Sequence, residues 1–544
     1  MDRFSSQIIR SSLFYASEEM GIALRNSAYS PNIKERMDHS AALFDRDGNL
    51  LAQAEHIPVH LGSLPWGLRN TIEFLKKESI ELEDNSMIVV NNPYISGTHL
   101  NDVTVIKPIF YNRRLVGFAA NKAHHSDVGG KVPGSISTDA RSLYEEGLVL
   151  NPVFLMKKGK FDRDILSVFS INSRNPYERK GDLKAQVAAN LTGDARVKEI
   201  IGKYGLREFL ESGEESFDYA ERMTLSKIDK IRKGRYVAED YLESPDGSDI
   251  RLKVKISVGD RNITVDYGGT SPQLSSPLNA VLGVTISGVQ FVFRSLLGEE
   301  VPVNAGTFRP FKILVPPETV LNPVFPAPVA GGNVETSQRN ADLLYLAMSK
   351  AIPDLVPAAA GGSMNNVMMG GFYRNKTWAF YETIGVGLGG RKGMDGIDGI
   401  HSNMTNTMNT PIEEIERSLP LILTRYQFRT NSGGMGEFRG GCGLVRSYKV
   451  KEGKVTVTVL AEREIHKPWG LEGGLPGKNT EVYLILDGKH VKGKAKGTYH
   501  LNEGDVFEIR TAGGGGYGQP SRRSCSAVEN DWKNRMMPRS KCRK

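Results

Sequence analysis

Residues that could bind a metal ion gather in one stretch of the sequence. Six of the ten histidines fall between positions 39 and 125, namely His39, His56, His60, His99, His124 and His125. Carboxylates stand among them, as Asp38 in RMDHS, Asp102 in THLNDV and Asp127 in HHSDV. Imidazole nitrogens combined with carboxylate oxygens suit Zn²⁺, Mn²⁺ or Fe²⁺ and leave coordination positions for water or a substrate. The residue types therefore allow a metal site if the fold brings them together.

Two predicted strands would bring two of these residues together. Residues 103–111 and 115–123 both read as strands, and three residues separate them. If they form one antiparallel hairpin, the numbers of paired residues sum to about 226, so Asp102 faces His124. Cross-strand neighbours lie about 5 Å apart. The hairpin therefore predicts contact between a carboxylate and an imidazole.

His99 lies over the same end of the hairpin, because it precedes Asp102 by three residues. His99, Asp102 and His124 are therefore predicted to converge. A single histidine on a strand is more often a hydrogen-bonded residue than a ligand, and a register shift of one residue would replace His124 by His125. The spacing alone leaves this choice open. The glycines at 129–130 fit either a turn with positive φ or a close approach of backbone to a ligand.

The remaining pattern predicts an α+β fold, multi-lobed with largely antiparallel sheets. Helical periodicity predicts helices over 4–26, 182–205 and 340–352, a helix at the end of 61–78, a charged helix-like stretch over 206–240 and a buried helix over 280–298. Strands are predicted over 87–90, in hairpins around Asp47-Gly48 and around the GDRN turn, and through 453–512.

Four regions are expected along the chain. They are a metal-site α+β lobe over 1–178, a helical segment over 179–245, an α+β lobe with Gly-rich loops over 246–518, and a basic tail over 519–544. The tail is expected to be a disordered, solvated extension. It holds eight Lys/Arg and two acidic residues, and so accounts for +6 of the formal net charge of +8. The body before it is close to neutral, which argues against nucleic-acid binding.

Composition places the chain among globular proteins. Hydrophobic residues make up 39% and charged residues 24% of the 544 positions, which is ordinary for such proteins. No apolar run reaches the length of about 18 residues that a membrane span needs, and no signal peptide is recognised at the start. The three cysteines, Cys442, Cys525 and Cys542, are too few for a disulfide framework. These features favour a reducing cytoplasm.

Other motifs are weaker. No GxxxxGK[ST] phosphate loop and no GxSxG nucleophile motif occur. GVGLGG at 385–390 matches GxGxxG, but no periodic helix follows it, so nucleotide binding is not favoured. Cys442 has no base nearby in sequence, which favours a packed structural role. TAGGGGYG at 511–518 reads as a flexible strand end, with an anion-cradling loop as the alternative.

Several longer stretches together resemble the hydantoinase B/oxoprolinase family. They include VNNPYISGTHLNDVTVIKPIF, GFAANKAHHSDVGGKVPGS, RMDHSAALFD, HIPVHLGSLP, GDLKAQVAAN, PVAGGNVETSQR, GGRKGMDGIDGIHSNMTNT and the closing AGGGGYG. They run in family order from about residue 4 to residue 518. The basic tail goes beyond the Gly-rich ending expected from the family.

The resemblance implies a cytoplasmic, metal-containing B-type subunit of an ATP-dependent amidohydrolase that acts on cyclic amides such as hydantoins or 5-oxoproline. Its partner would be an A-type subunit that binds ATP-Mg and phosphorylates the substrate, so the complex is expected to be a hetero-oligomer. A subunit of a ketone carboxylase and a scaffold subunit with a structural metal are the alternatives. The absence of a phosphate loop agrees with this division of labour.

The family pattern implies roles for six residues. Asp38, His99, Asp102 and His124 would bind a divalent metal, with Zn²⁺ or Mn²⁺ expected and Fe²⁺ as a further candidate. His125 and Asp127 would either contact the ligands from outside or act as catalytic acid or base, and for His125 a place on the opposite strand face is the alternative. Three of the ligands, His99, Asp102 and His124, are those that the hairpin selects independently.

Overall fold

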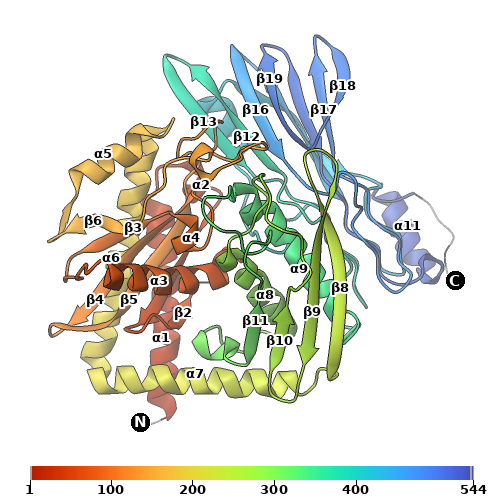
Figure 1. The fold of residues 1–544 in the computed structure, drawn as a ribbon. Helices are drawn as coiled ribbons and strands as arrows, with labels where there is room; N and C mark the ends of the chain where they lie inside the picture. The colour runs from red at the N-terminus through yellow and green to blue at the C-terminus, as the bar shows by residue number, and fades with distance from the viewer. Residues whose placement is uncertain (1–2, 55, 539–541, 543–544) are drawn as a thin grey trace.

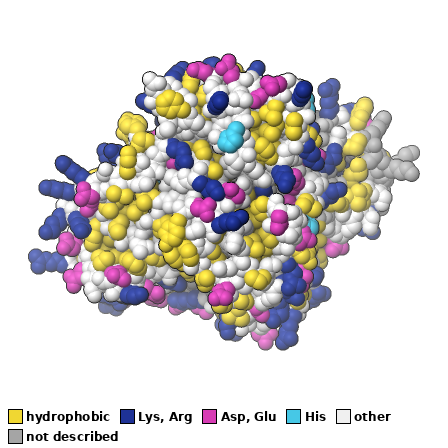
Figure 2. Space-filling model, turned by 45° about the horizontal axis from the view of Figure 1, so that its top comes forward, with side chains coloured by type: hydrophobic (Ala, Val, Ile, Leu, Met, Phe, Trp, Pro, Cys, Tyr) yellow, Lys and Arg dark blue, Asp and Glu magenta, His cyan; other side chains and the backbone are white. Residues whose placement is uncertain are grey.

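The computed structural model describes residues 3–54, 56–538 and 542 and has the predicted α+β architecture, with sheets that are almost entirely antiparallel (Figure 1). Among these residues no helix combines the length and the apolar character needed to cross a membrane. On the face shown in Figure 2, basic and acidic side chains are interspersed, with hydrophobic side chains between them.

The first sheet has seven strands in the order β2-β1-β5-β4-β3-β6-β7. They are β1 (His39–Asp45), β2 (Leu50–Gln53), β3 (Met87–Val90), β4 (Asp102–Tyr111), β5 (Arg114–His124), β6 (Val153–Lys157) and β7 (Lys160–Phe161). Helices α1 (Arg3–Ser27), α6 (Pro176–Tyr204) and α7 (Leu206–Ile228) share one hydrophobic core with β1 and β5. Helix α3 (His60–Lys77) packs on the other face. Short helices α2 (Pro31–Lys34), α4 (Pro93–Ser96) and α5 (Arg163–Ile171) complete this region.

The second sheet has the order β11-β10-β9-β8, and only its β10–β11 pair is parallel. Its strands are β8 (Gly234–Glu243), β9 (Asp249–Val258), β10 (Ile263–Asp266) and β11 (Phe311–Leu314). Helices α8 (Leu282–Leu297) and α9 (Ser337–Met348) pack with it in the largest core. A π-helical turn at Gly332–Thr336 leads directly into α9.

The last two sheets enclose a third core between them. One has the order β13-β12-β16-β19 and the other β14-β15-β20-β17-β18. The strands are β12 (Asn366–Tyr373), β13 (Lys376–Glu382), β14 (Leu421–Arg429), β15 (Gly443–Val450), β16 (Lys454–Leu460), β17 (Glu481–Leu486), β18 (Lys489–Gly493), β19 (Lys496–Asn502) and β20 (Val506–Arg510). Helix α10 (Ile412–Ser418) lies beside β14.

Buried ion pairs connect the second sheet to the third. Arg339 of α9 binds Asp240 of β8 (Nη1–Oδ1, 3.2 Å) and Glu462, just after β16 (Nη2–Oε2, 3.1 Å). Lys496 of β19 binds the other oxygen of Glu462 at 2.8 Å. Removing one member of such a network leaves a buried charge without its partner, which costs far more than the pair contributes. The network therefore holds these elements in one arrangement.

Two expectations about the middle and the end of the chain are wrong. The helix-like stretch over 206–240 includes the start of β8, because α7 ends at Ile228. From residue 236 onward buried and exposed residues alternate, and this strand pairs with β9. The predicted disordered tail instead forms helix α11 (Cys525–Lys533). Asp531 of this helix is buried and bridges Arg439 (3.0 Å) and Arg523 (3.0 Å). Asp531 thus ties this part of the tail to Arg439 in the body.

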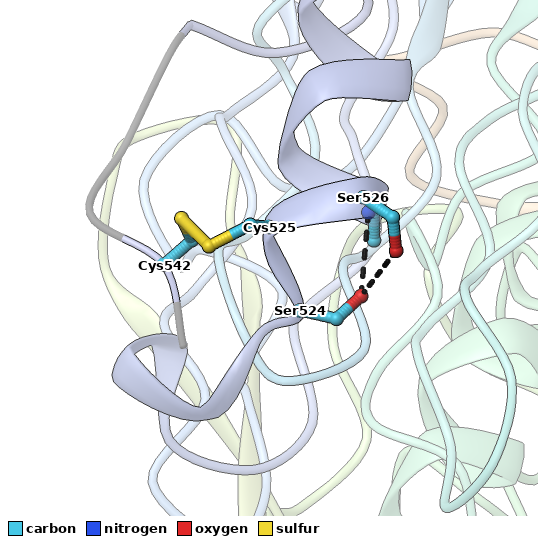
Figure 3. The surroundings of a disulfide bond; sticks show 5 residues. Ser524, Cys525, Ser526 and Cys542 are labelled. Carbon is cyan, nitrogen blue, oxygen red and sulfur yellow. Dashed lines mark hydrogen bonds between the residues drawn. A yellow bond between two sulfur atoms is a disulfide. The ribbon is translucent and has the colours of Figure 1, made fainter. Parts of the chain in front are cut away.

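The cysteines also depart from expectation. Cys525, at the start of α11, forms a disulfide with Cys542 (Figure 3). The side chain of Ser524 caps the same helix by accepting a hydrogen bond from the backbone of Ala527. Cys442 is free and buried, with its Sγ 3.5 Å from the carbonyl oxygen of Met536, as a structural cysteine would be.

The Gly-rich segments pack backbone against backbone, so neither reading of TAGGGGYG holds. Gly515 donates to the carbonyl of Ala359, and Gly390 of GVGLGG donates to that of Gly515. A Cβ on Gly514 would lie 2.0 Å from the carbonyl oxygen of Leu388. These glycines are buried, and each is needed because a side chain would occupy the place of a neighbouring strand of backbone. The GxGxxG match is part of this packing.

This packing predicts opposite effects for two glycine substitutions. Gly514→Ala should lower the free energy of unfolding by at least about 3 kcal/mol, because rigid backbone blocks the new methyl group. Gly202→Ala, in an exposed part of α6 with nothing within 4 Å of the new Cβ, should stabilise by about 0.5–1 kcal/mol. Chemical denaturation of both variants measures this, and equal effects would contradict the packing described.

Candidate metal centre

His99, Asp102 and His124 converge in the interior of the first lobe. His99 Nε2 lies 3.1 Å from Asp102 Oδ1, and His124 Nδ1 lies 3.3 Å from the same oxygen. The two histidine nitrogens are 3.1 Å apart. All three side chains are buried, and together they form the one group in the described residues with ligand atoms close enough to hold a metal ion. The predicted trio is therefore assembled by the fold.

The register of one hairpin brings Asp102 and His124 together. Asp102 pairs with His124 across β4 and β5, as the sequence predicts. The turn itself is tighter than predicted: Asn112 and Arg113 alone form it, both with positive φ (49° and 63°), as a type I′ turn requires. A bulge after Ile109 shifts the pairing by one residue. The shorter turn and the bulge together give the register predicted for a three-residue turn.

The spacing of the three donor atoms fits a cation. Bonds of about 2.0–2.2 Å at tetrahedral or octahedral angles place ligand atoms about 3.0–3.5 Å apart, and the observed separations fall in this range. Two imidazoles and one carboxylate suit Zn²⁺, Mn²⁺ or Fe²⁺. Asp38 lies beside the group, with its Oδ2 4.0 Å from His124 Nδ1. The residues present therefore fit a divalent metal.

Asp102 is oriented by further side chains. Its Oδ2 lies 3.3 Å from His60 Nε2 and 3.4 Å from Asn333 Nδ2, while His60 Nδ1 is 3.0 Å from Ser40 Oγ. Burial disfavours the charge of Asp102, but the neighbouring His99 and His60 outweigh it and hold the pKa of this carboxyl well below its usual range. The carboxylate is thus ionised, with one oxygen turned toward the two histidines His99 and His124.

The loop that carries His99 is held by a buried lysine. Lys122 donates to the carbonyl oxygen of Ser96 (2.8 Å) and to Thr98 Oγ1 (2.8 Å). Burial lowers the pKa of Lys122 to about 7. Because Lys122 lies two residues before His124 on β5, one strand positions both histidines.

The predicted acid and base residues lie elsewhere. His125 points to the opposite face of the sheet from His124, where its Nε2 is 3.0 Å from Gln186 Oε1 and its ring packs on Phe169. Burial lowers the pKa of His125 to about 4. Asp127 accepts two hydrogen bonds from Arg174, through the backbone and the guanidinium, at 2.9 Å each. The structure therefore brings neither residue to the metal centre. His125 follows the end of β5 and faces away from His124, and Asp127 lies in the loop beyond it, where Arg174 holds it.

The turn after the histidine pair has a structural explanation. Gly129 and Gly130 have φ values of +96° and +79°, and a Cβ on either would collide with backbone from another segment. The backbone nitrogens of Gly129 and Gly134 both donate to Asp127. Asp127 thus organises a tight loop, which is the turn reading of these glycines.

Sequence reasoning missed the residues around the trio. His60 was among the clustered histidines but had no predicted role. Asn333 lies on the π-helical turn, in PVAGGNVETSQR, and no local pattern connects it to Asp102. Tyr381 of β13 stacks on the ring of His124, with ring centroids 4.4 Å apart and planes 14° apart. Only the packing of distant segments reveals these neighbours.

A cleft of about 910 Å³ lies next to this centre, while His99, Asp102 and His124 themselves are buried and do not line it. Asn32, Ser126 and Tyr381 lie on its lining next to His124, whose carbonyl oxygen accepts a hydrogen bond from Asn32 Nδ2 at 2.7 Å. Much of the remaining lining is aromatic, from Tyr29, Tyr177, Phe372, Tyr373, Trp378 and Phe380. Such a surface suits a small, flat molecule with an apolar ring and a few polar atoms.

Fold and site together define an α+β protein with a buried centre of two histidines and one carboxylate. The chain belongs to the hydantoinase B/oxoprolinase family, whose model matches residues 2–520. An uncharacterised protein of Methanocaldococcus jannaschii is 49% identical over 98% of this chain and 94% of its own length. A Pseudomonas protein, named as the putative B-type subunit of a D-/L-hydantoinase, is 31% identical over 98% of this chain and 92% of its own.

Longer relatives and solved structures agree with this assignment. The 5-oxoprolinase 1 of Arabidopsis thaliana is 36% identical over 92% of this chain, which spans only 40% of that protein. The ATP-dependent caprolactamase of Pseudomonas jessenii superposes with a TM-score of 0.91 at 28% identity, over 99% of this chain and 95% of that one. An acetone carboxylase chain shares the fold, with a TM-score of 0.92 at 18% identity, over 98% and 78%.

The two adjacent histidines provide a matched test of the site. His124→Gln should weaken Zn²⁺ binding by more than about a hundredfold, because it removes a ligand. His125→Gln should leave the affinity within about threefold, although losing its buried contacts should cost about 1–2 kcal/mol of stability. Competition of the metal-free proteins against a chromogenic chelator measures both affinities. Equal losses in the two variants would contradict the assignment of His124.

Proposed function

We propose that this chain is the metal-containing B-type subunit of an ATP-dependent hydrolase of cyclic amides. The observation that carries the proposal is the buried group of His99, Asp102 and His124 beside an aromatic cleft. Family membership supports it, since relatives include proteins named as 5-oxoprolinase and as a B-type hydantoinase subunit. We further propose that the complex is cytoplasmic, because three cysteines in 544 residues are few for an oxidising compartment; the Cys525–Cys542 disulfide, close to the end of the chain, is the observation against this.

The proposed chemistry follows from the inertness of the amide bond. A lactam carbonyl resists attack by water, so an A-type partner subunit would first transfer a phosphoryl group from ATP to the amide oxygen. Addition of one water at the same carbon then breaks the ring C–N bond and leaves a free amine and an acyl phosphate. A second water hydrolyses the acyl phosphate to a carboxylate and phosphate. The partner supplies the ATP-Mg site, which agrees with the absence of a phosphate loop in this sequence.

This chain would contribute the metal and the pocket. A divalent cation, Zn²⁺ or Mn²⁺ in our proposal and Fe²⁺ as a further candidate, supplies Lewis acidity toward water and toward a carbonyl or phosphoryl oxygen. His60 and Asn333 contact Asp102 and fix its orientation, and His60 also helps to keep this carboxylate ionised. The aromatic walls of the cleft would hold a flat ring and exclude bulk water, and Asn32 beside His124 adds an amide for polar contacts.

Reconstitution with the partner subunit tests the reaction class. The complex should hydrolyse ATP faster when 5-oxoproline, a hydantoin or caprolactam is added, and the isolated chain should be nearly inactive. Acetone with bicarbonate is the comparison substrate. Stimulation by the ketone alone would replace the hydrolase by a ketone carboxylase.

The His124→Gln complex is the matched control for the role of the metal. It should assemble normally but lose cyclic amide hydrolysis by at least about a hundredfold. If that complex binds no metal and keeps full activity, the metal is structural and the chain is a scaffold.

A further inference from the structure

The ring of His124 is oriented in an unusual way for a metal ligand. Such histidines usually donate their second ring nitrogen to a carboxylate, a carbonyl or water, which fixes the ring. Here the second nitrogen, Nε2 of His124, is buried and has no hydrogen-bond partner in the described part of the chain. Another contact must therefore hold the plane of this ring.

Tyr381 makes that contact. Its ring lies nearly parallel to that of His124, at 14° with centroids 4.4 Å apart, and only 3% of the residue is exposed. The guanidinium carbon of Arg36 lies 4.9 Å from the centroid of the same tyrosine ring. Arg36 also donates to the carbonyl oxygen of Tyr381 (3.1 Å) and to Thr383 Oγ1 (2.6 Å). The tyrosine ring is thus fixed through its face and its backbone.

The hydroxyl of Tyr381 is fixed as well. It donates to Asn366 Oδ1 at 2.9 Å, and Asn366 Nδ2 donates to Glu335 Oε1 at 2.7 Å and to the carbonyl oxygen of Leu460 at 2.9 Å. Glu335 Oε1 also accepts the backbone N–H of Met364 at 3.1 Å. Asn366 and Glu335 are fully buried. A continuous buried chain therefore runs from Glu335 through Asn366 and Tyr381 to His124.

We propose that Tyr381 is a positioning residue for the metal, which orients the ligand His124 by ring stacking and is itself held by Asn366 and Glu335. The inference rests on the proposed metal centre. It predicts that the stacked face of the tyrosine matters more than its hydroxyl, because the hydroxyl acts on the ligand only through the ring. It also makes metal affinity depend on β12 and β13, more than 240 residues beyond His124 in the sequence.

Metal affinity of the apo-protein tests this without any enzymatic assay. Tyr381→Leu should weaken Zn²⁺ binding about ten- to a hundredfold, the loss typical for residues that orient metal ligands, and should change the visible absorption of the Co²⁺-loaded protein. Tyr381→Phe should bind within about threefold of wild type, because it keeps the stack. Tyr381→Met serves if the leucine variant does not fold, since it fills similar volume without a ring.

Phe380→Leu is the matched control, because Phe380 is the preceding buried aromatic on β13 and belongs to a different hydrophobic cluster. It should lose stability but keep wild-type affinity. Wild-type affinity in Tyr381→Leu, or an equal loss in Phe380→Leu, would overturn the role of Tyr381. If the wild-type protein binds no divalent metal, the proposed metal centre itself fails, which is a separate result.

Discussion

The pairing of Asp102 with His124 is the constraint on which the site depends. Side chains alternate between the two faces of a strand, so a shift of one residue between β4 and β5 would exchange His124 for His125. The observed register follows from a two-residue turn with positive φ at both positions and from one bulge. Asp38 directly precedes β1, and because β1 pairs with the other edge of β5, Asp38 lies at the same end of the hairpin as His124. The metal centre therefore depends first on the pairing of β4 with β5, because the register decides which side chains reach it.

The rest of the molecule encloses this end of the hairpin. Asn333 arrives from the π-helical turn, Tyr381 from the third sheet and His60 from α3. These elements are far apart in sequence and are held together by buried polar contacts, among them those of Arg36 and Arg339. Because a buried charge without its partners is costly, these contacts define one relative position of the lobes. The orientation of the ligands therefore depends on the whole chain.

The sequence predicted the parts of this site that depend on local spacing. The hairpin, its register and the trio of His99, Asp102 and His124 could be derived because they lie within 26 residues. The roles of His125 and Asp127 were not predictable in the same way. Both face surroundings built from α5, α6 and the loop between them, so only tertiary packing shows that Gln186 and Arg174 are their partners. The order of the tail also depends on a distant residue, Arg439.

The domain bounds drawn from composition stay a prediction, except where secondary structure bears on them. Strand β8 falls inside the segment expected to be helical, because its buried face carries the charged Asp240 and Glu243 while its exposed face carries Val237, so the sequence shows no clear alternation. The glycine motifs were misleading for a different reason. Glycine permits close approach of backbone to a phosphate or to other backbone, and the sequence does not distinguish the two.

The backbone-to-backbone packing of the glycines has a consequence for how the chain folds. Its segments near 359, 388, 434, 470 and 514 contact one another directly, so none has its final neighbours until the last has been synthesised. Closing loops of this length is entropically costly, and contacts so distant in sequence form slowly. The C-terminal half must therefore complete its assembly late. Because β13 belongs to that half, His124 would acquire its stacked partner only after the hairpin that carries it has formed.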